Sequence, residues 1–165
     1  MTTTLITGSN KGLGLEAARR LLAEGHDVWV AARDAAAGAQ AAADLGARFV
    51  QLDVTDDASV AAAVATVGEL DVLVNNAGIT GARKEVPDLT AADLREVFET
   101  NVFGPTRVLQ AFLPALLASA NGVVVNVASG LGSQAATHDP DRVEHHVVAP
   151  AYCSSKSALI MLTTQ

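Results

Sequence analysis

Short apolar runs rich in β-branched residues alternate along the chain with longer stretches rich in Ala and Leu. The apolar runs are typical of strands buried on both faces, and they cover residues 4–7, 28–32, 49–52, 72–74 and 123–127. The stretches between them have helical spacing, at residues 13–24, 35–45, 58–67 and 91–117. Because strand–helix–strand units favour right-handed crossovers, this alternation predicts a doubly wound α/β fold, in which helices cover both faces of a parallel sheet of about five strands.

Capping residues support these boundaries. Asp34 can cap the second helix, and Thr90-Ala91-Ala92-Asp93 is typical of a capping box. Gly25 and Gly46 follow the predicted ends of two helices, as helix-terminating glycines do. The assignment of strands and helices therefore has support from local chemistry as well as from hydrophobicity.

Two stretches interrupt the regular pattern. Gly104-Pro105 lies inside the longest helical stretch, so we expect a break or kink there that places Asn101 near an irregular turn. Residues 130–150 carry several His and Asp and two Pro, a composition that suits a surface loop. A helical pattern resumes over residues 152–165.

Length, charge and cysteine content narrow the class of protein. A chain of 165 residues fits a single domain spanning residues 1–165. No apolar tract has the length of a membrane span and the start of the chain lacks a leader signature, so we expect a soluble, cytoplasmic protein without a membrane partner. A net charge of -7 argues against binding to nucleic acid. The single cysteine, Cys153, cannot form an internal disulfide.

A glycine-rich turn lies between the first predicted strand and the first predicted helix. Glycines let the chain turn sharply and approach a pyrophosphate closely, and the N–H groups at the start of the helix bind anions. The spacing Gly-x3-Gly-x-Gly lacks the Lys-Ser/Thr of a triphosphate-binding loop, which argues against an ATPase or GTPase. An ordinary strand-to-helix turn is the alternative. We predict a Rossmann-type dinucleotide site formed by Gly8, Asn10, Lys11, Gly12, Leu13 and Gly14.

The end of the second predicted strand bears on the choice of cofactor. An acidic residue there would bind the ribose hydroxyls of NAD, whereas this strand ends in Ala32-Arg33-Asp34. Arg33 offers a forked donor for a 2′-phosphate and Lys11 adds a second cation, so we expect NADP(H) to be preferred and NAD(H) to be possible. Solvated surface charges are the alternative for both cations. Asp34 could reach a ribose, but we favour its role as a helix cap.

Tyr152 and Lys156 are four residues apart and therefore lie on one face of a helix. A nearby ammonium group stabilises the phenolate form of a tyrosine, which suits the tyrosine for proton exchange. Such a pair also occurs by chance on many helices, so its meaning depends on its neighbours.

In combination, these motifs resemble the short-chain dehydrogenase/reductase family along nearly the whole chain. The matching features occur in the family's order, and they are the glycine turn Gly8, Gly12 and Gly14, then Asp53-Val54, Asn75-Asn76-Ala77-Gly78, Asn101, Ser129 and Tyr152-x3-Lys156. Asn126-Val127-Ala128-Ser129 is similar to the family's Asn-Val-Ser-Ser segment, with Ala in place of the first serine. The cations Lys11 and Arg33 resemble those of the NADP-preferring branch that includes the carbonyl reductases.

The resemblance implies hydride transfer between the nicotinamide and a carbonyl or alcohol carbon of a small-molecule substrate. Tyr152 would be the general acid in reduction and the base in oxidation, and Lys156 would hold ribose hydroxyls and favour the Tyr152 phenolate. Ser129 would hydrogen-bond the substrate oxygen. Asn101 would help to hold a water molecule in a proton relay.

The resemblance also implies contacts to the cofactor. Asp53 would contact the adenine and Val54 would line its pocket, while Asn75, Ala77 and Gly78 would border the cofactor. Simpler structural roles remain open for several residues of the predicted site. Asp53 could cap a turn, Asn75 and Asn76 could satisfy loop backbone, Asn101 could stabilise a helix kink and Ser129 could be a turn hydroxyl.

Two departures from the family pattern matter. Between Ser129 and Tyr152 lie 22 residues, a long stretch that we expect to border the substrate cleft, and we predict no metal site at His138, His145 and His146. The chain also stops before the family's last strands and substrate lid. We therefore expect a C-terminally truncated member, with a catalytically impaired dinucleotide-binding or interaction module as the alternative and a homo-oligomer as a possible state.

Overall fold

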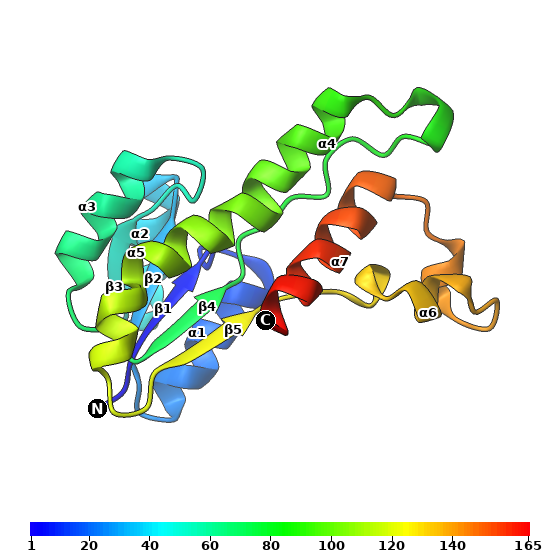
Figure 1. Cartoon of the computed structure of the whole chain (residues 1–165). Helices are drawn as coiled ribbons and strands as arrows, with labels where there is room; N and C mark the ends of the chain where they lie inside the picture. The colour runs from blue at the N-terminus through cyan, green and yellow to red at the C-terminus, as the bar shows by residue number, and fades with distance from the viewer. The chain divides into compact units, whose positions relative to one another are not determined.

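The computed structural model describes residues 1–165 and contains a five-stranded sheet. The strands are β1 (Thr3–Thr7), β2 (Asp27–Ala32), β3 (Arg48–Gln51), β4 (Val72–Asn75) and β5 (Val123–Asn126). They are arranged in the order β3-β2-β1-β4-β5, with β1 pairing in parallel with both β2 and β4. This order reverses direction beside β1, as in doubly wound sheets, and the predicted fold is confirmed (Figure 1).

The longer helices match the predicted ones except near residue 100. They are α1 (Gly12–Ala23), α2 (Ala35–Leu45), α3 (Asp57–Val67), α4 (Ala91–Phe98), α5 (Gly104–Ala118) and α7 (Pro150–Thr163). Shorter turns complete the set: α6 (Gln134–His138), the π-helix η2 (Glu99–Phe103) and the 3-10 helices η1 (Val86–Asp88), η3 (Gly130–Gly132) and η4 (Val143–His146). None of the helices combines the length and the apolar character that crossing a bilayer demands.

The chain divides into two compact units. The first unit comprises Met1–Ala77 and Pro105–Val125, and the second comprises Gly78–Gly104 and Asn126–Gln165. That residues 1–165 behave as one domain stays a prediction.

The first unit is built on the sheet. Alternate residues of a strand point to opposite faces, so the sheet needs cover on both. On one face, α3 and α5 pack against the central strands, and α1 and α2 lie on the other (Figure 1). The apolar core on the α3–α5 face consists of Leu5, Trp29, Ala31, Val50, Leu52, Val54, Val60, Ala63, Leu70, Leu73, Val108, Phe112 and Leu116.

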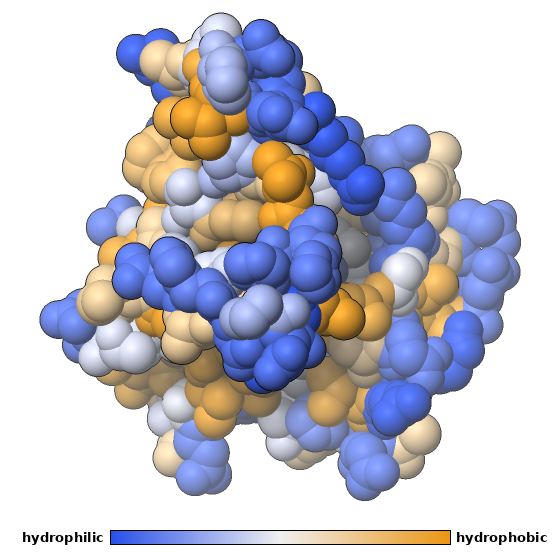
Figure 2. All heavy atoms as spheres, turned by 90° about the vertical axis from the view of Figure 1, so that its right-hand side faces the viewer, coloured by the Kyte–Doolittle hydropathy of each residue, from blue (hydrophilic) through white to orange (hydrophobic).

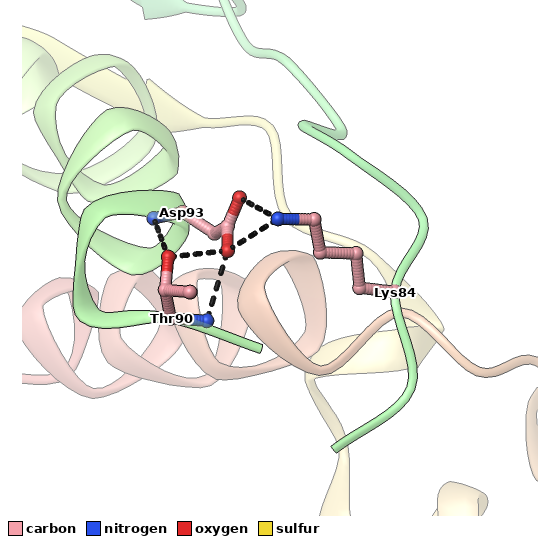
Figure 3. A network of polar contacts seen from close by, with 3 residues as sticks. All are labelled: Lys84, Thr90 and Asp93. Carbon is pink, nitrogen blue, oxygen red and sulfur yellow. Dashed lines mark hydrogen bonds and ion pairs between the residues drawn. The ribbon is translucent and has the colours of Figure 1, made fainter. Parts of the chain in front are cut away.

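The second unit holds the chain before α4 in place with a small polar network. Thr90 and Asp93 form the predicted capping box, in which the Thr90 hydroxyl accepts from Asp93 N and the Asp93 carboxylate accepts from Thr90 N. Lys84 Nζ lies 2.9 Å from both Asp93 carboxylate oxygens (Figure 3). The hydrogen bond from the Thr90 hydroxyl, followed by that from Lys84, lowers the pKa of Asp93 to about 2.

The predicted kink at Gly104-Pro105 takes the form of a π-turn just before it. Pro105 has no N–H to donate to the carbonyl of Asn101, four residues earlier, so the regular hydrogen-bond ladder cannot continue there. The chain widens into η2 over Glu99–Phe103, and α5 begins at Gly104. Asn101 lies within this irregular turn, as expected, and is fully buried.

Residues 130–150 contain more regular structure than the predicted surface loop. Hydroxyl caps explain part of the difference, because Ser129 Oγ accepts from Leu131 N at the start of η3 and Ser133 Oγ accepts from Ala136 N at the start of α6. The next long helix, α7, starts at Pro150, two residues before the predicted start, since proline suits the first position of a helix.

Large apolar side chains are exposed in both units. Leu117 of the first unit is 76% exposed and Val143 of the second is 78% exposed. On the face drawn in Figure 2, apolar residues lie among hydrophilic ones. Exposed apolar residues scattered in this way are common on folded proteins and do not by themselves mark an interface.

Candidate functional site

The glycine turn of the first unit leaves the start of α1 without a side-chain cap. Lys11 is the N-cap residue and makes no side-chain capping hydrogen bond, and the first turn of α1 contains no acidic residue. Gly8 and Gly12 have φ of 64° and 60°, in the left-handed region that favours glycine. Because the first N–H groups of a helix have no partner within the helix, this end suits an anion such as a diphosphate.

The segment after β4 packs directly on this turn. A Cβ atom on Gly8 would lie 2.9 Å from Ala77 Cα, and one on Gly14 would lie 2.5 Å from Asn76 Nδ2. Asn76 Nδ2 donates to the carbonyls of Thr7 and Gly8, at 2.8 and 3.1 Å. Asn76 thus satisfies loop backbone, the simpler role considered for it, and fixes the shape of the turn.

Two buried hydroxyls that sequence reasoning missed, those of Thr7 and Ser9, fix the glycine turn through hydrogen bonds to backbone groups. Thr7 Oγ1 accepts from the backbone N–H groups of Asn76 and Ala77, both at 3.0 Å. Ser9 Oγ donates to Ile6 O at 2.7 Å and accepts from Ala31 N at 3.1 Å. Their position inside the glycine motif was the available signal, because a buried hydroxyl in a turn must find backbone partners.

The predicted cofactor residues around the turn differ in exposure. Lys11 and Arg33 are exposed, Asn10 is half-buried and the Leu13 side chain is 79% exposed at the start of α1. Asp34 Oδ1 accepts from Ala37 N at 3.0 Å, so Asp34 is a helix cap, as favoured from the sequence.

After β3, Asp53 caps a turn. Its Oδ1 accepts from both the N–H and the hydroxyl of Thr55, at 2.9 and 2.7 Å. The Thr55 N–H bond is the largest cause of a lowered pKa of Asp53, with smaller contributions from the charges of Arg33 and Arg107. Val54 is buried, and Arg107 Nη1 donates to its carbonyl at 2.7 Å. Asn75, at the end of β4, is also buried.

In the second unit, α7 places Lys156 beside Tyr152. Only 4% of Lys156 is exposed, and its Nζ donates to Val127 O at 2.7 Å. The same nitrogen lies 5.7 Å from the centre of the Tyr152 ring. Burial lowers the pKa of Lys156 from its ordinary value. The two side chains therefore share a helix face, as their spacing predicted.

The turn that follows Ser129 packs tightly against α7. Ser129 Oγ accepts from Leu131 N at 3.2 Å, so the turn-hydroxyl role considered for it is present, and its own O–H can still donate. A Cβ atom on Gly132 would lie 2.7 Å from the carbonyl carbon of Lys156. Ser157 Oγ donates to Gly132 O at 2.7 Å.

Asn101 reaches from the π-turn η2 toward α7. Its Oδ1 accepts from Ile79 N and its Nδ2 donates to Ile79 O, both at 2.8 Å, which anchors the chain just after Gly78. Nδ2 also donates to Ser155 Oγ at 3.0 Å, and Ser155 Oγ donates to Tyr152 O at 2.7 Å. Sequence reasoning missed Ser155, because no spacing rule links it to a residue 54 positions away.

The second unit thus joins Asn101, Tyr152 and Lys156 through α7 and packs the Ser129 turn on the same helix. Two histidines of residues 130–150 lie within hydrogen-bond distance of nearby backbone carbonyls. His138 Nδ1 lies 2.8 Å from Gln134 O, and His145 Nδ1 lies 3.0 Å from Thr137 O.

Known proteins share both the sequence pattern and the fold. The chain is 38% identical over 175 residues to the short-chain dehydrogenase anuI of Penicillium roqueforti, which covers 96% of this chain and 69% of that protein. It is 35% identical over 165 residues to the 2-dehydro-3-deoxy-L-rhamnonate dehydrogenase (NAD(+)) of a Sphingomonas species, which covers 96% of this chain and 62% of that protein. The structure of NADPH-bound carbonyl reductase from chicken fatty liver matches with a TM-score of 0.89 at 34% identity, covering 99% of this chain and 71% of that one.

The chain spans between 62% and 71% of the length of these three proteins. Over residues 2–165 it also matches the protein family described as short chain dehydrogenase. Because that match covers nearly every residue and both curated relatives are more than a third identical, the chain belongs to the short chain dehydrogenase family of oxidoreductases.

Proposed function

We propose that the protein transfers a hydride between NADP(H) and a carbonyl or alcohol substrate, with Tyr152 as the general acid or base. The observation that carries this proposal is the buried Lys156 beside Tyr152. Burying an ammonium group costs free energy, and the Lys156 ammonium donates to a backbone carbonyl, Val127 O, rather than to a carboxylate. A cation held in this way supports a nearby phenolate, which is what a proton-donating tyrosine requires.

The first unit has the features that a dinucleotide needs. The uncapped start of α1 would hold the diphosphate, and the left-handed Gly8 and Gly12 allow close approach of the backbone. We assign Arg33 and Lys11 to the 2′-phosphate of NADP(H) and Asp53 and Val54 to the adenine. Asn10, Leu13, Gly14, Asn75, Ala77 and Gly78 stay as proposed cofactor neighbours.

The nicotinamide, when bound, supplies or accepts the hydride. In reduction, Tyr152 donates its phenolic proton to the substrate oxygen while the carbonyl carbon gains the hydride, so the product is an alcohol. The Ser129 hydroxyl donates a hydrogen bond to the same oxygen, and Lys156 stabilises the phenolate that Tyr152 becomes. In oxidation each of these steps runs in reverse.

Asn101 stays a proposed part of a proton relay. Both hydrogens of its Nδ2 are directed to Ile79 O and Ser155 Oγ. A relay water held by this side chain would therefore have to use the second lone pair of Oδ1.

The test is oxidation of NADPH by the purified chain with a panel of ketones, aldehydes and quinones. Tyr152→Phe removes the donated proton and should lower kcat roughly 10²- to 10⁴-fold, while the Kd for NADPH stays within about twofold. Full turnover by this variant would exclude Tyr152 as the proton donor. NADPH binding by the native chain without any turnover would instead support the second candidate, a non-catalytic dinucleotide-binding or interaction module.

A further inference from the structure

Ser155 lies between two residues of the proposed acid–base site. It is fully buried on α7, one position before Lys156, and its hydroxyl links the Asn101 side chain to the Tyr152 main chain. We propose that Ser155 is a positioning residue that fixes the orientation of Tyr152 for proton transfer. This inference rests on the proposed function.

The Ser155 hydroxyl has one hydrogen to donate, and it donates this hydrogen to the main-chain carbonyl of Tyr152. Ser155 Oγ donates to Tyr152 O at 2.7 Å, and it accepts from Asn101 Nδ2 at 3.0 Å. A serine that bonds back to a carbonyl one turn earlier is common in helices. Here Ser155 Oγ also accepts from the Asn101 side chain of η2. The two hydrogen bonds of Ser155 together connect the start of α7 to η2.

Asn101 is itself rigidly held, which makes this link informative about position. Its amide is paired with both the N–H and the carbonyl of Ile79. The result is a chain of hydrogen bonds that runs from Ile79 through Asn101 and Ser155 to the backbone of Tyr152. Removing the Ser155 hydroxyl would leave a hydrogen of Asn101 Nδ2 without its acceptor in a buried site, where unsatisfied donors are costly.

Tyr152 needs such support because it lies in the first turn of α7. The N-cap residue, Ala149, provides no side-chain hydrogen bond to this turn. Lys156 has its own anchor at Val127 O and does not depend on Ser155. Loss of the Ser155 link should therefore shift Tyr152 more than Lys156, and a displacement of about 1 Å of a reacting group can cost on the order of 10²-fold in rate.

The kinetic test compares Ser155→Ala with Ser154→Ala. Ser154 is the exposed neighbour on the same helix and serves as the matched control. We expect Ser155→Ala to lower kcat roughly 10- to 100-fold, with the KM for NADPH within about twofold, and Ser154→Ala to keep native values. Ser155→Cys, which is similar in size and a weaker donor, carries the same test if the alanine variant does not fold.

A second readout does not depend on turnover. Tyr152 is the single tyrosine of the chain, so labelling with fluorotyrosine gives one ¹⁹F resonance that reports on its ring. Ser155→Ala should move or broaden this resonance, and Ser154→Ala should leave it unchanged. An unmoved resonance, or a kcat within twofold of native, would overturn the inference.

The outcomes separate this inference from the proposed function. A native chain that lacks turnover, or a fully active Tyr152→Phe variant, contradicts the proposed function, and the resonance alone then decides whether Ser155 positions Tyr152. Native turnover that depends on Tyr152 but not on Ser155 contradicts only the positioning role.

Discussion

Arg33 is the residue on which the proposed choice of cofactor depends most directly. It is exposed at the end of β2, where its carbonyl accepts from Gln51 Nε2 at 3.1 Å. Its guanidinium lies close enough to Asp53 to contribute to the lowered pKa of that carboxyl. The side chain therefore carries its charge beside the residue that we assign to the adenine end of the cofactor.

Replacing Arg33 by Ala should weaken binding of NADPH and spare NADH. A hydrogen bond to a charged group contributes about 1.5–3 kcal/mol, so the Kd for NADPH should rise roughly 10- to 100-fold. Calorimetric titration of both cofactors measures this, and Arg19→Ala, which removes an exposed cation of α1, is the control for net charge. Equal losses for the two cofactors, or a native preference for NADH, would contradict the assignment.

Asp93 gives the second unit a pH-dependent contribution to stability. Its pKa is about 2 in the folded protein, below its usual value of 3.8, so the carboxylate stays ionised where the unfolded chain is already protonated. The contribution is complete above pH ~4 and is lost as the pH falls toward about 2.

We expect Asp93→Asn to have a lower Tm than the native protein between about pH 5 and about pH 7, which is at least ~1 pH unit above the usual pKa of an Asp carboxyl. The difference in Tm should shrink as the pH falls toward about 2. Thermal unfolding at a series of pH values measures it. A difference in Tm that stays constant across this range would show that the carboxylate charge contributes nothing.

At the scale of elements, the backbones of η3 and α7 pack too closely to admit a side chain at residue 132. A Cβ on Gly132 would lie 2.7 Å from Lys156 C and 2.9 Å from Ser157 N, and both of these are backbone atoms that cannot rotate away. The turn carrying Ser129 can approach the helix carrying Tyr152 only because residue 132 lacks a side chain.

Gly132→Ala should therefore force η3 and α7 apart. Overpacking of this kind typically costs about 1–3 kcal/mol, so we expect a lower Tm, together with a kcat that falls more than the affinity for NADPH. Ser157→Ala, which removes the hydrogen bond to Gly132 O without adding volume, is the control. A Gly132→Ala variant with native Tm and kcat would show that the two elements separate freely.

The elements also show what a single sequence can reveal. The strands and long helices follow from periodicity, and the kink beside Pro105 follows from its missing N–H. The π-turn itself was not predictable, because the position at which a helix takes up an extra residue depends on what its side chains contact. Asn101 lies in that turn and bonds to Ile79 and Ser155, residues far away along the sequence.

At the scale of the whole molecule, the two units carry different parts of the proposed function: the first carries the residues proposed to bind the cofactor, and the second carries those proposed for acid–base catalysis. The first unit offers the uncapped helix start and the exposed cations, and the second offers the buried Lys156 and its neighbours. Motif order named these residues as candidates before their surroundings were known, and their roles stay predictions. The supporting bonds of Thr7, Ser9 and Ser155 were not predicted, because each has its partner in another segment: backbone N–H groups for Thr7 and Ser9, and the Asn101 side chain for Ser155.

The π-turn at Glu99–Phe103 has a consequence for how this segment tolerates change. Such a turn corresponds to one inserted residue, and successive residues of an α-helix are rotated by about 100°. Deleting Glu99 or Thr100 would swing the Asn101 amide by about that angle around the axis of α4 and away from Ile79. Natural variation here should consequently exchange residue types while conserving their number, so that gaps in aligned relatives fall on either side of this turn and not within it.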